Sequence, residues 1–191
     1  MKLYYKGKYD LNPESLPHGV HQPGAVPFNE VKDSKSLGLM ANIMGAIVFV
    51  LLGTVLYLRS GNAFFSIQLS LGCLFASLLF IPHELLHAIC FKEDVCLYTN
   101  LKHGLLFVVG PESMSKNRFI LMCMLPNILF GFIPFTIAML YPSLVFWGAF
   151  GTLSIAMGVG DYYNVFNAIT QMPKGARTYL YQFNSFWYMP T

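Results

Sequence analysis

The sequence predicts an all-α polytopic membrane protein with about four transmembrane helices and a small cytoplasmic β-hairpin between the second and third helices. Of its 191 residues, 55% are hydrophobic and only 11% are charged, whereas soluble domains carry about 25% charged residues. The mean hydropathy is +0.52. Three stretches contain no charged residue, and each is long enough to supply the roughly 20 apolar residues that cross a bilayer: 36–58, 60–83 and 119–160.

The predicted elements follow one another without an internal repeat, so we expect one membrane domain with two flanking segments. Residues 1–36 hold five lysines and four prolines, which favours a polar amino-terminal arm on the cytoplasmic face of the membrane. The membrane domain covers residues 37–170. Its four predicted helices are 37–58, 63–90, 119–141 and 143–170.

Two further segments lie outside the predicted helices. In residues 91–118, two short apolar runs flank Lys102-His103-Gly104, a pattern that predicts the hairpin. Residues 171–191 are rich in aromatic side chains, which favour the headgroup level of a bilayer. We therefore expect an interfacial aromatic tail.

The placement of lysine and arginine predicts the orientation in the membrane. The arm, the 91–118 loop and the tail hold five, four and two of them, whereas Arg59 is the only one in the two remaining turns. Because basic loops stay cytoplasmic, we expect a multi-pass protein of the cell membrane with both termini cytoplasmic. The basic residues form no patch interleaved with aromatics, so the bilayer is an expected partner and nucleic acid is not.

Residues 83–87 read His-Glu-Leu-Leu-His, an HExxH pattern. Residues four apart lie on nearly the same face of an α-helix, so His83 and His87 can bind one metal ion while Glu84 projects beside it. This is the zincin arrangement of two histidine ligands and a glutamate general base.

A third ligand is predicted at Asp161. It and Glu84 are the only acids of the apolar portion, and His83 and His87 are its only histidines. At about 1.5 Å per residue, these side chains can lie at similar depths below the cytoplasmic surface. Ionisable groups inside a bilayer cost about 2.5–3.5 kcal/mol each and usually signal function. Asn127, at a similar depth, is expected either to contact the substrate or the oxyanion, or to satisfy backbone groups freed by the preceding proline.

This ligand set suits Zn²⁺ and also accommodates Fe²⁺ or Co²⁺. Two imidazoles and a carboxylate leave tetrahedral zinc one position for water, whose pKa falls to about 7. Glu84 would accept the proton of that water as it attacks a peptide carbonyl, and would pass the proton to the leaving amine.

These residues give the chain a family resemblance. With His83, Glu84 and His87 in one span and Gly160-Asp161 in the last, the chain from about Leu37 onward resembles a zincin peptidase family of bacterial membrane proteins. It is more distantly similar to the site-2-protease class of intramembrane zinc metalloproteases. That class has Leu-Asp-Gly where this chain has Gly-Val-Gly-Asp-Tyr. The resemblance implies a Zn²⁺ cofactor, the same three ligands and Glu84 as the base.

The sequence therefore favours a membrane-embedded zinc endopeptidase that acts on membrane proteins or peptides, with the edge of the hairpin available to an extended substrate. The alternative is a non-catalytic metal-binding membrane protein, such as a sensor, carrier or regulator, which would be indifferent to Glu84. A third hypothesis is a scaffold without metal. Residues 158–161 also match the GxGD pattern of intramembrane aspartyl proteases, but the second Asp candidate, Asp10, lies in the polar arm.

Overall fold

The structure is a computed structural model that describes residues 1–31, 34–100, 102, 105–181 and 184–190. Its chain forms two compact units that alternate along the sequence. Unit 1 consists of residues 1–32, 80–123 and 164–191, and unit 2 of residues 33–79 and 124–163.

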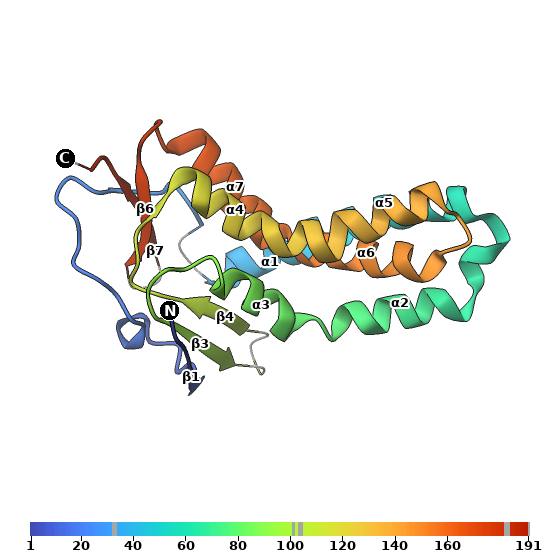
Figure 1. Ribbon diagram of the computed structural model, residues 1–191, viewed down its shortest axis with the longest axis horizontal. Helices are drawn as coiled ribbons and strands as arrows, with labels where there is room; N and C mark the ends of the chain where they lie inside the picture. The colour runs from blue at the N-terminus through green and yellow to red at the C-terminus, as the bar shows by residue number, and fades with distance from the viewer. Residues whose placement is uncertain (32–33, 101, 103–104, 182–183, 191) are drawn as a thin grey trace. The chain divides into compact units, whose positions relative to one another are not determined.

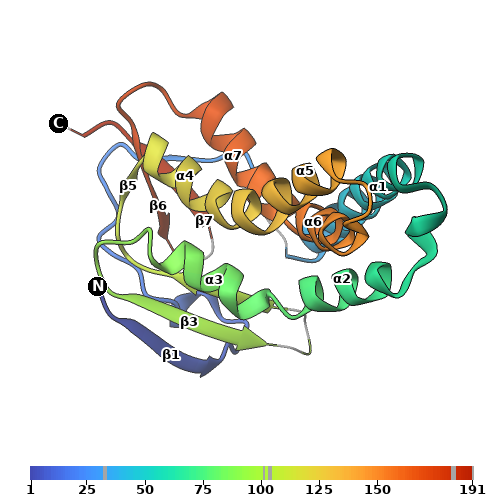
Figure 2. The same ribbon diagram turned by 45° about the vertical axis from the view of Figure 1, so that its right-hand side comes forward.

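Unit 2 is helical. Its α6 (Val145–Met157) packs against α1 (Ser34–Ser60), α2 (Ile67–Ser77) and α5 (Ile133–Leu140), which run alongside one another in both views (Figures 1 and 2). The 3₁₀ helix η2 (Gly61–Phe65) joins α1 to α2, and the π-helix η4 (Asn127–Phe132) precedes α5. Gly72 on α2 permits the close approach of α6, because a Cβ there would overlap the backbone of Phe146.

Unit 1 contains two sheets. The first has the order β1-β3-β4, formed by Leu3–Lys8, Val95–Asn100 and Leu105–Val109, and β1 is parallel to β3 while β4 is antiparallel to it. The second has the order β2-β7-β6-β5, formed by Val26–Pro27, Asn184–Tyr188, Arg177–Tyr181 and Met114–Ser115. The helix α3 (Phe80–Ala88) packs on β4, and Figure 2 shows it lying over the first sheet.

Both chain ends contribute to the cores of unit 1. Tyr9 and Leu16, beside the 3₁₀ helix η1 (Pro13–Ser15), are buried in one cluster with Tyr98 of β3. Phe28 is buried in a second cluster with Ala168 of α7 (Val159–Gln171). The helix α4 (Lys116–Pro126) connects unit 1 to η4.

The predicted all-α fold is wrong, because the described residues contain seven strands in two sheets beside the helices, which makes the fold mixed α/β. The physical reason is that pairing partners lie far apart in the chain. Leu3 pairs with Val95, and Val26 pairs with Trp187, so no local pattern predicts these two pairings, whereas β6 and β7 pair as a local hairpin. The predicted hairpin between the apolar helices is present as β3 and β4, and residues 101, 103 and 104 of its turn lie outside the described residues.

The expected number of four membrane spans is also wrong. Within the described chain, two helical stretches are long and apolar enough to cross a membrane, Ser36–Phe65 and Lys116–Leu140, and a third is reached only if α2 and α3 count together across their break. The predicted span 143–170 is divided at Gly158 into α6 and α7, each of 13 residues, and a crossing needs about 20. The two long apolar helices are compatible with membrane association.

Candidate metal centre

The helix α3 carries the HExxH residues. Pro82 lies in its first turn, where a missing N–H is tolerated because the first backbone donors have no partner within the helix. The helix ends at Ala88, and the turn that follows it is closed by a hydrogen bond of 2.9 Å from the N–H of Phe91 to the carbonyl oxygen of Ala88. His83 and His87 are therefore held on one face, one turn apart.

The structure brings His83, Glu84 and His87 together in unit 1. One ligand atom from each lies within 4.8 Å of the others, and all three side chains are half-buried. The two imidazole rings meet edge to face, with centroids 4.7 Å apart. Two imidazoles and a carboxylate are donors that zinc accepts, so the residues present fit this metal.

A backbone carbonyl orients His87. Its Nδ1 lies 2.9 Å from the carbonyl oxygen of Met122 on α4. A carbonyl can only accept a hydrogen bond, so Nδ1 carries the proton and Nε2 keeps the lone pair that a metal needs. Histidine ligands of metals almost always have such an outer partner, which fixes their tautomer and their ring orientation.

A backbone N–H holds Glu84 in turn. The N–H of Val108 on β4 donates to Glu84 Oε2 over 3.0 Å. Since β4 is an edge strand of its sheet, this N–H points away from β3. The contacts of Met122 and Val108 were missed by sequence reasoning, because backbone donors and acceptors are the same in every residue type and leave no signal in the sequence.

A buried ion pair fixes the segments around α3. Glu112 is 8% exposed and accepts hydrogen bonds from the N–H groups of Lys92 and Glu93 and from the Arg118 guanidinium. Arg118 also donates to the carbonyl oxygen of Cys90 over 2.8 Å. Burial raises the pKa of Glu112, but the Arg118 and backbone hydrogen bonds outweigh it and hold the pKa below its ordinary value. The pair therefore ties the end of α3 to the start of α4, which supplies the Met122 carbonyl.

Unit 2 contains the other predicted site residues, and it links them by hydrogen bonds. Asn127, at the start of η4 and 1% exposed, donates from Nδ2 to Asp161 Oδ2 over 2.7 Å. The Tyr162 hydroxyl donates to Asn127 Oδ1 over 3.1 Å, which fixes the orientation of the amide. A Cβ at Gly158 would overlap Asn127 Oδ1, so a larger residue fits there only if the Asn127 amide turns away.

This network gives Asn127 a role that the sequence did not indicate, namely the orientation of the Asp161 carboxylate. Its predicted contact with the substrate or the oxyanion stays a prediction. Asp161 belongs to unit 2 and the HExxH residues to unit 1, so its part as the third ligand also stays a prediction.

A comparison with protein families identifies one match. The model of a family described as “Putative zincin peptidase” matches residues 76–177, which is more than half of the chain. The matched region includes both histidines of the HExxH pattern, Glu84, Asn127 and Asp161. Neither a curated protein nor a solved structure matches the chain.

Proposed function

We propose that this chain, which belongs to the family described as “Putative zincin peptidase”, is a membrane-embedded zinc metalloendopeptidase. Its substrates in this proposal are membrane-associated proteins. The observation that carries the proposal is the cluster of His83, Glu84 and His87, with the ring of His87 and the carboxylate of Glu84 each held by a backbone hydrogen bond. A site that only binds metal needs no base held beside its ligands.

In this proposal His83, His87 and Asp161 hold the zinc. Zinc bound there supplies a Lewis acid that lowers the pKa of a water molecule to about 7. Glu84 takes the proton from the attacking water on its carboxylate and delivers it to the nitrogen of the leaving amine. The Val108 N–H limits rotation of that carboxylate, and the Met122 carbonyl limits rotation of the His87 ring.

An extended substrate fits the outer edge of β4. In an antiparallel ladder, the N–H and C=O groups of one residue face the partner strand and those of the next residue face away. The outward N–H of Val108 therefore implies that the backbone groups of Leu106 also face outward. A peptide pairing with this edge would lie beside Glu84 with its backbone extended, which favours cleavage inside a chain over removal of a terminal residue.

The test uses the full chain in phosphatidylcholine vesicles, with its zinc content measured by elemental analysis and a peptide library digested and read by mass spectrometry. We expect Glu84→Gln to keep stoichiometric zinc and to lose cleavage by at least about 100-fold, because general-base catalysis contributes about 10²–10⁴-fold. His83→Ala should lose both zinc and cleavage. The matched control is Glu93→Gln, which alters an exposed carboxylate nine residues further on and should change neither.

Three outcomes would contradict the proposal. Cleavage that persists in Glu84→Gln would show that this residue is not the base. Stoichiometric zinc without cleavage by the unaltered chain would support the non-catalytic metal-binding alternative. A chain that takes up no zinc would support a scaffold.

A further inference from the structure

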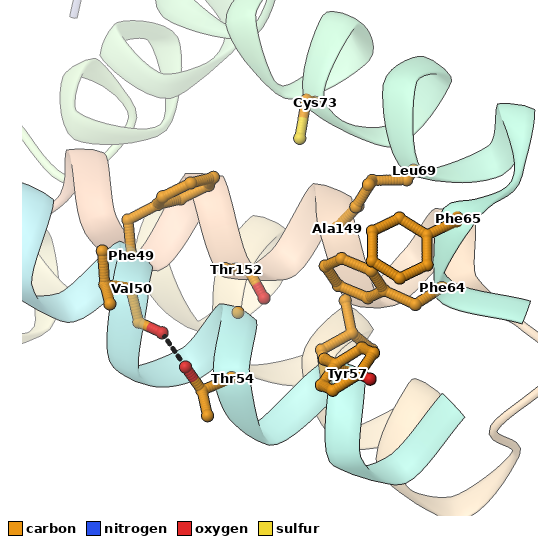
Figure 3. A pocket seen from close by; sticks show the side chains of 12 residues that line it. Phe49, Val50, Thr54, Tyr57, Phe64, Phe65, Leu69, Cys73, Ala149 and Thr152 are labelled. Atoms are coloured by element: carbon orange, nitrogen blue, oxygen red, sulfur yellow. Dashed lines mark hydrogen bonds between the residues drawn. The ribbon is translucent and has the colours of Figure 1, made fainter. Parts of the chain in front are cut away.

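Unit 2 contains a second candidate site, which shares no residue with the HExxH segment. A cavity of about 440 Å³ lies among α1, η2, α2 and α6 (Figure 3), within the about 300–1,000 Å³ of small-molecule sites. The side chains that line it are Phe49, Val50, Thr54, Leu56, Tyr57, Phe64, Phe65, Leu69, Cys73, Ala149 and Thr152, together with Gly53.

The walls of this cavity are apolar and uncharged. Four aromatic rings are among the lining side chains, and no Asp, Glu, Lys or Arg is among them. The hydroxyl of Thr54 is used within its own helix, since it donates to the carbonyl oxygen of Val50 over 2.8 Å (Figure 3). A charged ligand would lose its hydration without gaining a partner, so the lining favours an uncharged molecule.

Thr152 supplies one polar group at the buried wall. It is 2% exposed, and its hydroxyl oxygen has no hydrogen-bond partner in the part of the chain that the structure describes. A threonine in a helix commonly donates to the carbonyl of the preceding turn, but here Figure 3 shows the oxygen directed into the cavity. A buried hydroxyl without a partner is costly, and a ligand oxygen within the cavity would satisfy it.

The neighbouring helix indicates where such a ligand comes from. The front wall of the cavity is α1, which belongs to the candidate span Ser36–Phe65, and only 6% of the most apolar window of that span is buried. A helix with this composition and exposure has lipid as its solvent when it crosses a bilayer. The molecules dissolved beside it are then lipids.

We propose that this cavity binds one uncharged single-chain lipid whose only polar group is a hydroxyl or carbonyl oxygen. That oxygen hydrogen-bonds with Thr152, and the aliphatic chain lies against the aromatic rings of Phe49, Tyr57 and Phe64. Because the surrounding lipid tails are as apolar as the cavity walls, burial of the aliphatic chain adds little to the affinity, and the hydrogen bond to Thr152 contributes about two- to tenfold. The site needs neither the metal nor peptidase activity.

Two glycines of α1 provide a matched pair of substitutions. A Cβ at Gly53 meets nothing within 4 Å, and Gly53 lines the cavity, so the Cβ of Gly53→Leu finds room and the rest of the leucine side chain competes with the ligand for the space at the cavity wall. A Cβ at Gly38 also meets nothing within 4 Å, and Gly38 is not a lining residue. Gly38→Leu therefore makes the same chemical change in the same helix outside the cavity.

The experiment uses the full chain in phosphatidylcholine vesicles with a long-chain alcohol that carries a photoreactive diazirine. Labelled residues are mapped by mass spectrometry. We expect labels on Tyr57, Phe64 or Cys73, a loss of that labelling of about two- to tenfold in Gly53→Leu, where leucine displaces the ligand from its hydrogen bond, and unchanged labelling in Gly38→Leu. Circular dichroism and zinc content show whether each variant is folded.

A competition experiment tests the hydrogen bond to Thr152. Unlabelled hexadecanol should compete with the probe about two- to tenfold better than hexadecane, and Thr152→Val, which keeps the shape of the side chain, should remove that difference. Equal labelling of the unaltered chain, Gly53→Leu and Gly38→Leu would overturn the proposal, because it would mean that the label comes from probe in the surrounding lipid alone. Equal competition by hexadecane on the unaltered chain would overturn the assigned role of Thr152, and stronger competition by palmitate than by hexadecanol would overturn the preference for an uncharged ligand.

Discussion

Replacing Asn127 by alanine should weaken zinc binding without touching a predicted ligand. The substitution removes the 2.7 Å hydrogen bond from the amide to the Asp161 carboxylate. A hydrogen bond to a charged group contributes about 1.5–3 kcal/mol, which corresponds to a factor of about 10 to 100 in an equilibrium constant. We therefore expect the Kd for zinc to rise about 10- to 100-fold, the range that outer partners of metal ligands show.

The measurement is a competition between the full chain and a chromogenic zinc chelator at neutral pH. Gly158→Ala provides an independent route to the same state, because its Cβ would overlap Asn127 Oδ1 and force the amide to turn. The matched control is Gly160→Ala, where a Cβ meets nothing within 4 Å. We expect Gly158→Ala to weaken zinc binding as Asn127→Ala does, and Gly160→Ala to leave it unchanged.

Two results would refute this reasoning at different points. If Asp161→Ala weakens zinc binding and Asn127→Ala does not, the hydrogen bond does not orient the ligand. If neither variant changes the affinity while His87→Ala abolishes binding, Asp161 is not a ligand at all. A loss of helical circular dichroism in Asn127→Ala would attribute its effect to the fold, and Gly158→Ala then decides between the two explanations.

The remaining predictions concern the surroundings of the site. Tyr162→Phe removes only the neutral hydrogen bond to Asn127, so the Kd for zinc should rise by no more than about tenfold. A larger rise in the chelator competition would mean that Tyr162 does more than orient the Asn127 amide. Val108→Pro removes the N–H that holds Glu84, and no hydrogen bond within the sheet is lost at this outer edge. We expect kcat to fall about tenfold or more at unchanged zinc content and KM; unaltered cleavage would refute the positioning, and a rise in KM alone would indicate lost substrate pairing instead. Glu112→Gln should lower the free energy of unfolding by about 1.5–3 kcal/mol at neutral pH, because it removes the negative partner of the Arg118 guanidinium, whose side chain is 20% exposed. Folding lowers the pKa of Glu112 from an ordinary value of 4.5, so its stabilisation is present above that value and is lost as the pH falls through the folded-state pKa. The free energies of unfolding of the unaltered chain and of Glu112→Gln, measured by denaturant titration, should therefore converge on acidification. A difference that does not change with pH would contradict the assignment.

The chemistry of the site was more readable from the sequence than the fold. Glu84 and its flanking histidines are predictable because ligand spacing in a helix follows from its 3.6-residue period, and the structure does bring the three together. The contacts of Met122 and Val108 were not predictable, because they are made by backbone atoms of residues 35 and 24 positions away in the chain.

The sheets escaped prediction for a related reason. The overall apolar composition indicates helices, but β1 is short and mostly exposed, and its sequence Leu-Tyr-Tyr-Lys-Gly-Lys has no clear alternation. Its partner strand β3 lies at the other side of α1 and α2 in the sequence. The tail, with its many aromatic residues, has the composition of an interfacial segment and equally that of strands. Side chains alone could not decide between these structures: β6 and β7 pair with each other, and the sheet is completed by Val26 and Ser115 far away in the chain.

The parallel pairing of β1 with β3 and the antiparallel pairing of β2 with β7 imply an order of events during synthesis. Val26 must wait for Trp187, which at about 5–20 residues per second takes on the order of ten to thirty seconds. The helices of unit 2 need mostly local hydrogen bonds and can form well before then. The helices of unit 2 can therefore form before the second sheet of unit 1 is complete, and any hydrolytic activity that depends on a complete unit 1 would begin only after residues 184–188 have been made.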